Sequence, residues 1–252
     1  MVATINLKPV VLPVFLAASI GLVSAPANAF SLRDTEHGES LFQVFNSLVQ
    51  IESFQLMDEE LNVRKLRAES LRWAGGSESV DIFLINEGAG FRNQLLFTAN
   101  GNEPQMIFAD ISSKESGLPE IDGTMALGEG KSLGGFSGDT SLNFLIKANG
   151  LLDPNGYIYG ANPELNPDKL QHVIAYEYFD EVMSESWVIL GFEDLYGEYS
   201  TEVDGSDRDF NDVVVAIKGV ASDPVETEDV PEPSAMLSLM VISGLMGVTR
   251  RR

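Results

Sequence analysis

Between Asp34 and Glu52 the apolar positions recur at spacings of three and four, which places them along one stripe of an α-helix. Either Asp34 or Thr35 is expected to cap this helix, and two glutamates lie near its positive end. We therefore expect one amphipathic helix that packs on the domain near its N-terminus. The residues of the stripe are Leu41, Phe42, Phe45, Leu48 and Val49.

After this helix, short runs of valine, isoleucine, phenylalanine and leucine alternate with glycine, asparagine and aspartate, a pattern typical of β-strands and turns. In Val80–Ile85 both alternating sets are largely apolar, so this strand is expected to be buried on both faces. Many short strands predict an all-β fold, a jelly-roll-like β-sandwich with one N-terminal helix. The predicted strands are Arg67–Trp73, Val80–Ile85, Gln94–Thr98, Gln105–Ala109, Ser141–Ala148, His172–Phe179, Ser186–Phe192 and Val213–Lys218.

The N-terminal end has the composition of a signal peptide. Val10–Val23 is mostly apolar, and Ala27-Asn28-Ala29 supplies the small residues of a signal-peptidase site. We expect residues 1–29 to be removed by signal peptidase after Ala29. The alternative is an uncleaved N-terminal anchor.

The C-terminal end combines a polar break, an apolar run over Ala235–Val248 and a terminal basic cluster. The flanking residues are Pro231, Glu232 and Pro233 before the run and Arg250, Arg251 and Arg252 after it. This layout of residues 231–252 resembles the PEP-CTERM sorting signal of bacteria that make extracellular polymeric matrix. The resemblance implies transient membrane insertion as a transmembrane helix, recognition by an exosortase and removal of the tail, much as a GPI tail is removed. The alternative is a permanent single-pass anchor.

Between these ends, residues 30–220 are expected to form one domain, followed by an acidic, proline-bearing linker over residues 221–230. The chain carries 38 acidic and 16 basic residues, a net charge of −22 at pH 7. Four of the basic residues lie in the removable ends, so the mature domain is more acidic still. Such a surface repels nucleic acid and anionic lipid headgroups but suits divalent cations. The absence of cysteine excludes thiolate-based zinc and iron–sulfur sites.

Carboxylates are concentrated from Glu193 to Asp212, between the last two predicted strands. The series Asp207-x-Asp209-x-Asn211 matches the opening of an EF-hand loop, but Asp212 replaces the required glycine and Lys218 the bidentate glutamate. An EF-hand is therefore rejected, whereas a Ca²⁺ site built from a loop and a strand is predicted, because Ca²⁺ takes six to eight hard oxygen ligands. The alternative is a solvated acidic loop. The candidate ligands are Glu193, Asp194, Asp207, Asp209, Asn211 and Asp212.

Two of these segments also resemble a known family. Gly191-Phe192-Glu193-Asp194-Leu195 and the series from Asp207 to Val214 are similar to the signature of the domain-of-unknown-function family 4114, and Gly90-Phe91-Arg92-Asn93 resembles its start. The resemblance spans roughly Ser79 to Lys218. It implies a β-rich module of exported bacterial proteins, with no established activity, and its acidic signature suggests calcium.

The residues favour a protein that is not an enzyme. Only His37 and His172 are present, too few for a histidine zinc site, and we expect His172 to be a strand residue that packs near the acidic loop. We expect an exported protein of the cell surface or extracellular matrix that binds Ca²⁺ and associates with an extracellular polysaccharide or surface polymer. The alternative is a secreted carbohydrate-binding or carbohydrate-active protein that uses His172 or a carboxylate pair. The aromatic residues that could stack on sugars, or equally form core and rim, are Trp73, Trp187, Tyr157, Tyr159, Tyr176, Tyr178 and Tyr196.

Overall fold

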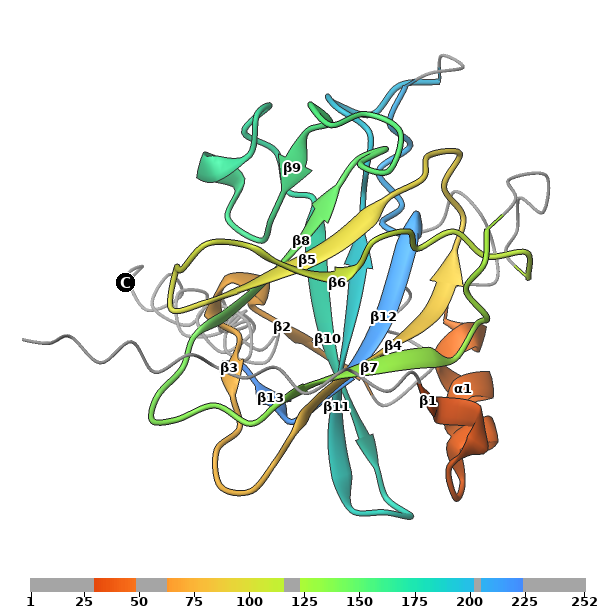
Figure 1. Ribbon diagram of the computed structural model, residues 1–252, viewed down its shortest axis with the longest axis vertical. Coiled ribbons are helices and arrows are strands. Elements are labelled where there is room, and N and C mark those ends of the chain that lie inside the picture. Colours follow the sequence, from red (N-terminus) through yellow and green to blue (C-terminus); the bar gives the residue numbers. More distant parts are fainter. Residues whose placement is uncertain (1–29, 49–62, 116–122, 202–204, 224–252) are drawn as a thin grey trace, which may run out of the picture.

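The computed structural model describes residues 30–48, 63–115, 123–201 and 205–223, which form a β-sandwich with one α-helix (Figure 1). The predicted all-β fold with an N-terminal helix is thereby confirmed. The predicted signal peptide and sorting tail lie outside the described residues. No helix in the described ranges has the length and apolar character needed to cross a membrane.

The larger sheet is antiparallel and has the strand order β1-β7-β4-β12-β11-β10-β2. Its centre is formed by long apolar strands, and its two edges by short ones. The bounds are β1 Phe30–Ser31, β2 Val63–Leu66, β4 Val80–Glu87, β7 Glu129–Gly134, β10 Val173–Asp180, β11 Glu185–Phe192 and β12 Val213–Lys218.

The smaller sheet has the order β6-β5-β8-β9 and is also antiparallel. Its strands are β5 Gln94–Ala99, β6 Gln105–Phe108, β8 Leu142–Lys147 and β9 Ile158–Tyr159. A separate pair joins β3, Arg72–Trp73, to β13, Val220–Ala221. The chain passes from one main sheet to the other between β4 and β5, β6 and β7, β7 and β8, and β9 and β10, so neither sheet is formed from one continuous stretch of sequence.

One continuous hydrophobic core contains residues of both sheets and of the helix. In β4, Ile82 and Phe83 point to opposite faces and both are buried, as expected for a strand covered on two sides. Helix α1, Gly38–Ser47, contributes Phe45, whose ring lies 5.4 Å from that of Tyr178 and 5.5 Å from that of Trp187. Burial of such aromatic side chains is a major favourable term in the folding of this cysteine-free domain.

The start of the helix differs from the prediction. The residue before its first turn is His37, which has a left-handed backbone and no side-chain capping bond, whereas Asp34 and Thr35 lie upstream. The reason is a 3₁₀ turn, η1, over Leu32–Asp34, which the Thr35 hydroxyl closes by donating to the Leu32 carbonyl at 2.8 Å. The hydroxyl expected to cap α1 is therefore used by the preceding turn.

Two further boundaries also differ from the prediction. The expected strand Arg67–Trp73 is interrupted by the 3₁₀ turn η2, Ala68–Ser70, so only Arg72–Trp73 of this segment forms a strand. At the other end, Ala221 pairs with Arg72, and the Asp223 carbonyl accepts a hydrogen bond from the Arg67 amide. Ala221 and Asp223, the first and third residues of the expected linker, are therefore hydrogen-bonded to the domain.

Candidate metal centre

The predicted ligands lie in the loop that connects β11 to β12. These two strands are antiparallel neighbours, and Phe192 at the end of β11 pairs with Val213 at the start of β12. The two ends of the loop therefore lie side by side, however long the intervening segment is. This register brings Glu193 close to the acids that precede Val213, although they are more than ten residues away in sequence.

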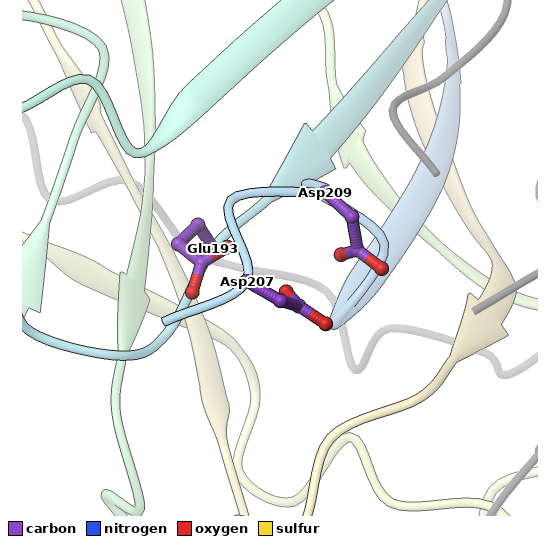
Figure 2. Close-up of side chains that lie close together, drawn as sticks. All are labelled: Glu193, Asp207 and Asp209. Atoms are coloured by element: carbon purple, nitrogen blue, oxygen red, sulfur yellow. The ribbon is translucent and has the colours of Figure 1, made fainter. Parts of the chain in front are cut away.

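Three carboxylates converge in this loop (Figure 2). Glu193, Asp207 and Asp209 each present a carboxylate oxygen, and these atoms lie within 4.8 Å of one another. The side chain of Glu193 is fully buried, that of Asp209 is buried and that of Asp207 is partly buried. We call these three residues the acidic triad.

Glu193 is the most constrained member of the triad. Its Oε1 accepts a hydrogen bond from the Ser206 hydroxyl at 2.8 Å, while its buried Oε2 has no hydrogen-bond partner among the described residues. Burial raises the pKa of Glu193 to about 7, and the negative charges of Asp207 and Asp209 act in the same direction. A buried carboxylate oxygen without a partner is costly, and a bound cation would remove that cost.

The backbone around the triad adopts an uncommon conformation. Arg208 and Phe210, on either side of Asp209, have φ angles of 58° and 59°, a left-handed region that residues with a side chain rarely occupy. The Arg208 guanidinium donates to the Gln171 carbonyl and lies 5.1 Å from the centre of the Phe210 ring. The backbone N–H of Asn211 also donates to the Asp209 carboxylate at 3.1 Å. These contacts hold the loop in a strained shape, as is often seen at functional sites.

The other three predicted ligands are not part of the triad, and two of them, Asp194 and Asp212, form a neighbouring network. The Asp194 amide donates to the Asp212 carboxylate at 2.7 Å, and the Asp194 carboxylate accepts from the Asn93 side chain at 2.5 Å. Burial raises the pKa of Asp194 and of Asp212, and nearby acids, including Glu193, raise both further. Asn211 is buried, and its side-chain oxygen lies 3.3 Å from the position that a Cβ on Gly88 would occupy.

Several residues of this region were not predicted from the sequence. Asn93 and Glu87 are buried beside the acidic loop, and Glu87 pairs with Val213 across β4 and β12. Both are far from the loop in sequence. Asn93 lies in the segment that resembles the start of the family, but nothing in that segment indicates a contact with Asp194. Ser206 could have been found, because a hydroxyl beside an acidic run is a common hydrogen-bond donor to a carboxylate.

The expected packing of His172 near the acidic loop is confirmed. Its ring is buried, with Nδ1 2.8 Å from the Glu193 carbonyl oxygen and Nε2 2.9 Å from the Asp168 carboxylate. Burial alone would raise the pKa of Asp168, but hydrogen bonds from the Gly197 amide and from His172 outweigh it and hold the pKa below its ordinary value. His172 and Asp168, which precede β10, therefore contact Glu193 and Gly197, the two ends of the segment 193–197.

The donor set of the triad suits a hard divalent cation. Its three carboxylates contain six oxygen atoms, and no histidine or cysteine takes part. Ca²⁺ takes six to eight oxygen ligands in flexible geometry, while Mg²⁺ requires a nearly ideal octahedron and retains several waters. Zinc sites are formed mainly by nitrogen and sulfur ligands, which this group lacks.

The fold and the site together define an antiparallel β-sandwich with a buried acidic triad in the loop between two central strands. Residues 136–220 match the model of a family described as Domain of unknown function (DUF4114), and this match includes the whole triad. The match begins after Gly90–Asn93, so it does not include the segment that was predicted to resemble the start of the family. No curated protein and no solved structure matches the chain.

Proposed function

We propose that this protein is an exported, non-catalytic protein of the cell surface or extracellular matrix whose β-sandwich binds Ca²⁺ through the acidic triad. The observation that carries the metal part is the buried Oε2 of Glu193, which has no hydrogen-bond partner among the described residues and belongs to a group of three converging carboxylates. A bound cation would give this carboxylate oxygen a positively charged partner. The net charge of −22 further favours cation uptake.

The proposed role of the metal is to neutralise and order the loop between β11 and β12. Without a cation, three carboxylates repel one another, and burial of Glu193 opposes its ionised form. With Ca²⁺, all three become ligands in their ionised form, and the strained backbone at Arg208 and Phe210 gains a compensating interaction. A loop ordered in this way can form a rigid binding surface. We propose that this surface associates with an extracellular polysaccharide or surface polymer.

The export part of the proposal rests on the sequence at the two ends. The apolar segment before Ala29 and the series Pro231-Glu232-Pro233 with the terminal arginines support processing by signal peptidase and by an exosortase-type enzyme. Transient membrane insertion of the tail would precede its removal. The chain contains no cysteine, so no disulfide stabilises the exported domain.

Isothermal titration calorimetry of the full-length chain with CaCl₂ tests the metal site. We expect saturable binding, and we expect Glu193→Gln and Asp209→Asn each to weaken it by at least about tenfold, because each removes a charged ligand. Glu198→Gln is the matched control, since Glu198 lies in the same loop and is exposed. Absence of binding at millimolar Ca²⁺, or equal losses in all three variants, would contradict the proposed site.

A further inference from the structure

Of two neighbouring exposed tyrosines, one lies in the loop between β11 and β12 and the other precedes β9. Tyr157 directly precedes β9, and Tyr196 lies in the loop after β11; 52% and 56% of their surfaces are exposed. Their ring centres are 5.4 Å apart, and the ring planes differ by 32°. From this geometry we propose that the Tyr157–Tyr196 pair is a binding surface for neutral hexose polysaccharides, which deepens the proposed function by naming the class of polymer.

The pair is held in place by buried neighbours. Tyr157 contacts the fully buried Tyr159 at a ring distance of 6.1 Å, and its carbonyl accepts from the Ala148 amide at 2.9 Å. Next to Tyr196, the Gly197 amide donates to the Asp168 carboxylate at 2.9 Å. A binding surface whose anchors are fixed before the ligand arrives loses little conformational entropy on binding, and tyrosine has few rotatable bonds to order.

The chemistry of the pair matches the face of a sugar ring. A tyrosine ring carries partial negative charge on its face and a hydroxyl at its rim, so it offers both a surface for C–H groups and a hydrogen-bonding group. A hexose presents C–H groups on one face and hydroxyls at its edge. Two adjacent rings whose planes differ by 32° can therefore contact one sugar unit of a chain.

The size of the surface also favours a glycan over a protein partner. Two half-exposed tyrosines offer about 200 Å² of aromatic surface. A stable protein interface buries about 800 Å² on each partner, several times this area.

The charge of the surroundings selects a neutral polymer. Glu198 is exposed two residues after Tyr196, Asp153 is exposed in the turn before Tyr157, and the chain as a whole carries a net charge of −22. These charges repel the carboxylates of uronic-acid polymers and the phosphates of nucleic acids. A neutral hexose chain experiences no such repulsion.

The surface is physically connected to the acidic triad. The ring of Tyr159 stacks on that of His172 with a centre distance of 3.8 Å, and His172 Nδ1 lies 2.8 Å from the Glu193 carbonyl oxygen. Tyr196 itself follows Glu193 by three residues in the same loop. Ca²⁺ at the triad would therefore hold one of the two tyrosines in its position.

The test is binding of the full-length chain to maltohexaose and cellohexaose, with a guluronate hexamer as the anionic comparison, each in Ca²⁺ and in EDTA. We expect binding to a neutral hexasaccharide, and we expect Tyr157→Ala or Tyr196→Ala to weaken it by about tenfold. Tyr157→Phe and Tyr196→Phe keep the ring and should retain most of the affinity. The matched control is Phe179→Ala, because Phe179 is 46% exposed in the β10–β11 hairpin, whose turn lies at the opposite end of the molecule from β9 (Figure 1).

The outcomes separate this inference from the proposed metal site. Ca²⁺ binding without affinity for either neutral hexasaccharide, or sugar binding that both alanine variants leave unchanged, overturns the tyrosine surface and leaves the metal site standing. Preference for the guluronate hexamer in Ca²⁺ also overturns it. Sugar binding in EDTA by a chain that takes up no Ca²⁺ supports the surface and contradicts the metal site. Thermal unfolding of each variant shows whether a loss of binding reflects a loss of fold.

Discussion

At the scale of single residues, the site depends on where carboxylates are buried. The alternation of Asp207 and Asp209 with other residues drew attention to both, the resemblance of the preceding segment drew attention to Glu193, and the structure brings these three carboxylates together. The separation of the triad from Asp194, Asn211 and Asp212 could not be predicted. Asp194 instead accepts a hydrogen bond from Asn93, which lies 101 residues away in sequence.

The pKa of Glu193 predicts an unusual pH dependence for the metal-free protein. Because burial raises this pKa to about 7, the folded state binds a proton more tightly than the unfolded state. The resulting stability is fully present below the unfolded pKa of about 4.5 and is lost as pH rises through about 7. The pKa values of Asp194 and Asp212 are also raised, so both act in the same direction. The pKa of Asp168 is lowered, so it changes the stability only in acid, as pH falls through the ordinary pKa range of an aspartate.

We therefore expect the melting temperature of the full-length chain in EDTA to be lower at pH 8 than at pH 6, as measured by differential scanning calorimetry. Saturating Ca²⁺ should raise the melting temperature most at pH 8, because the ligands bind the metal in their ionised form. Glu193→Gln should reduce the slope between these pH values. A melting temperature that rises from pH 6 to pH 8 in EDTA would show that these carboxylates are not buried as described.

At the scale of the elements, the long apolar strands were predictable and the short ones were not. Strands β4, β10, β11 and β12 are rich in valine, isoleucine and aromatic residues, and burial on both faces removes the need for alternation. Strands of two residues, such as β9 and β13, form only because a neighbouring strand offers free hydrogen-bonding groups. The sequence pattern of β7 also failed to indicate a strand, since it contains two glycines and three polar residues.

Gly130 in β7 provides a test of this packing. A Cβ at this position would lie 2.4 Å from the Phe83 ring, and that ring also contacts Phe30 and Trp187. We expect Gly130→Ala to destabilise the chain by about 1–3 kcal/mol in urea unfolding, because the aromatic cluster must shift. Gly90→Ala is the control, since nothing lies within 4 Å of the added atom. Equal stability of the two variants would contradict the close packing of β7 on Phe83.

At the scale of the whole molecule, a large negative charge surrounds a core that has no cross-links. The net charge of −22 opposes compaction by self-repulsion, and this effect is screened by salt and neutralised locally by divalent cations. The proposed Ca²⁺ site and the proposed export together imply that the domain gains stability where Ca²⁺ is abundant outside the cell. The two-sheet architecture could be predicted from strand number, but its strand order could not, because the chain crosses repeatedly between the sheets.

Mass spectrometry of the intact protein from its native host tests the export proposal. We expect the mature chain to begin at Phe30, because Ala29 completes the signal-peptidase site, and to lack the three terminal arginines. Replacement of Glu232 by alanine should prevent removal of the tail. A native product that retains Arg250, Arg251 and Arg252 would contradict processing and favour a permanent anchor.

The register of β11 and β12 has one practical consequence. The Ser200 amide donates to the Ser206 carbonyl at 2.8 Å, so the loop is closed at a neck on the outer side of Glu193 and Asp207. Thr201 is exposed next to Ser200, while the paired strand ends and the Ser206 hydroxyl position the Glu193 carboxylate. The position after Thr201 is thus a suitable place to insert an epitope, whose accessibility on intact cells would report where the protein resides.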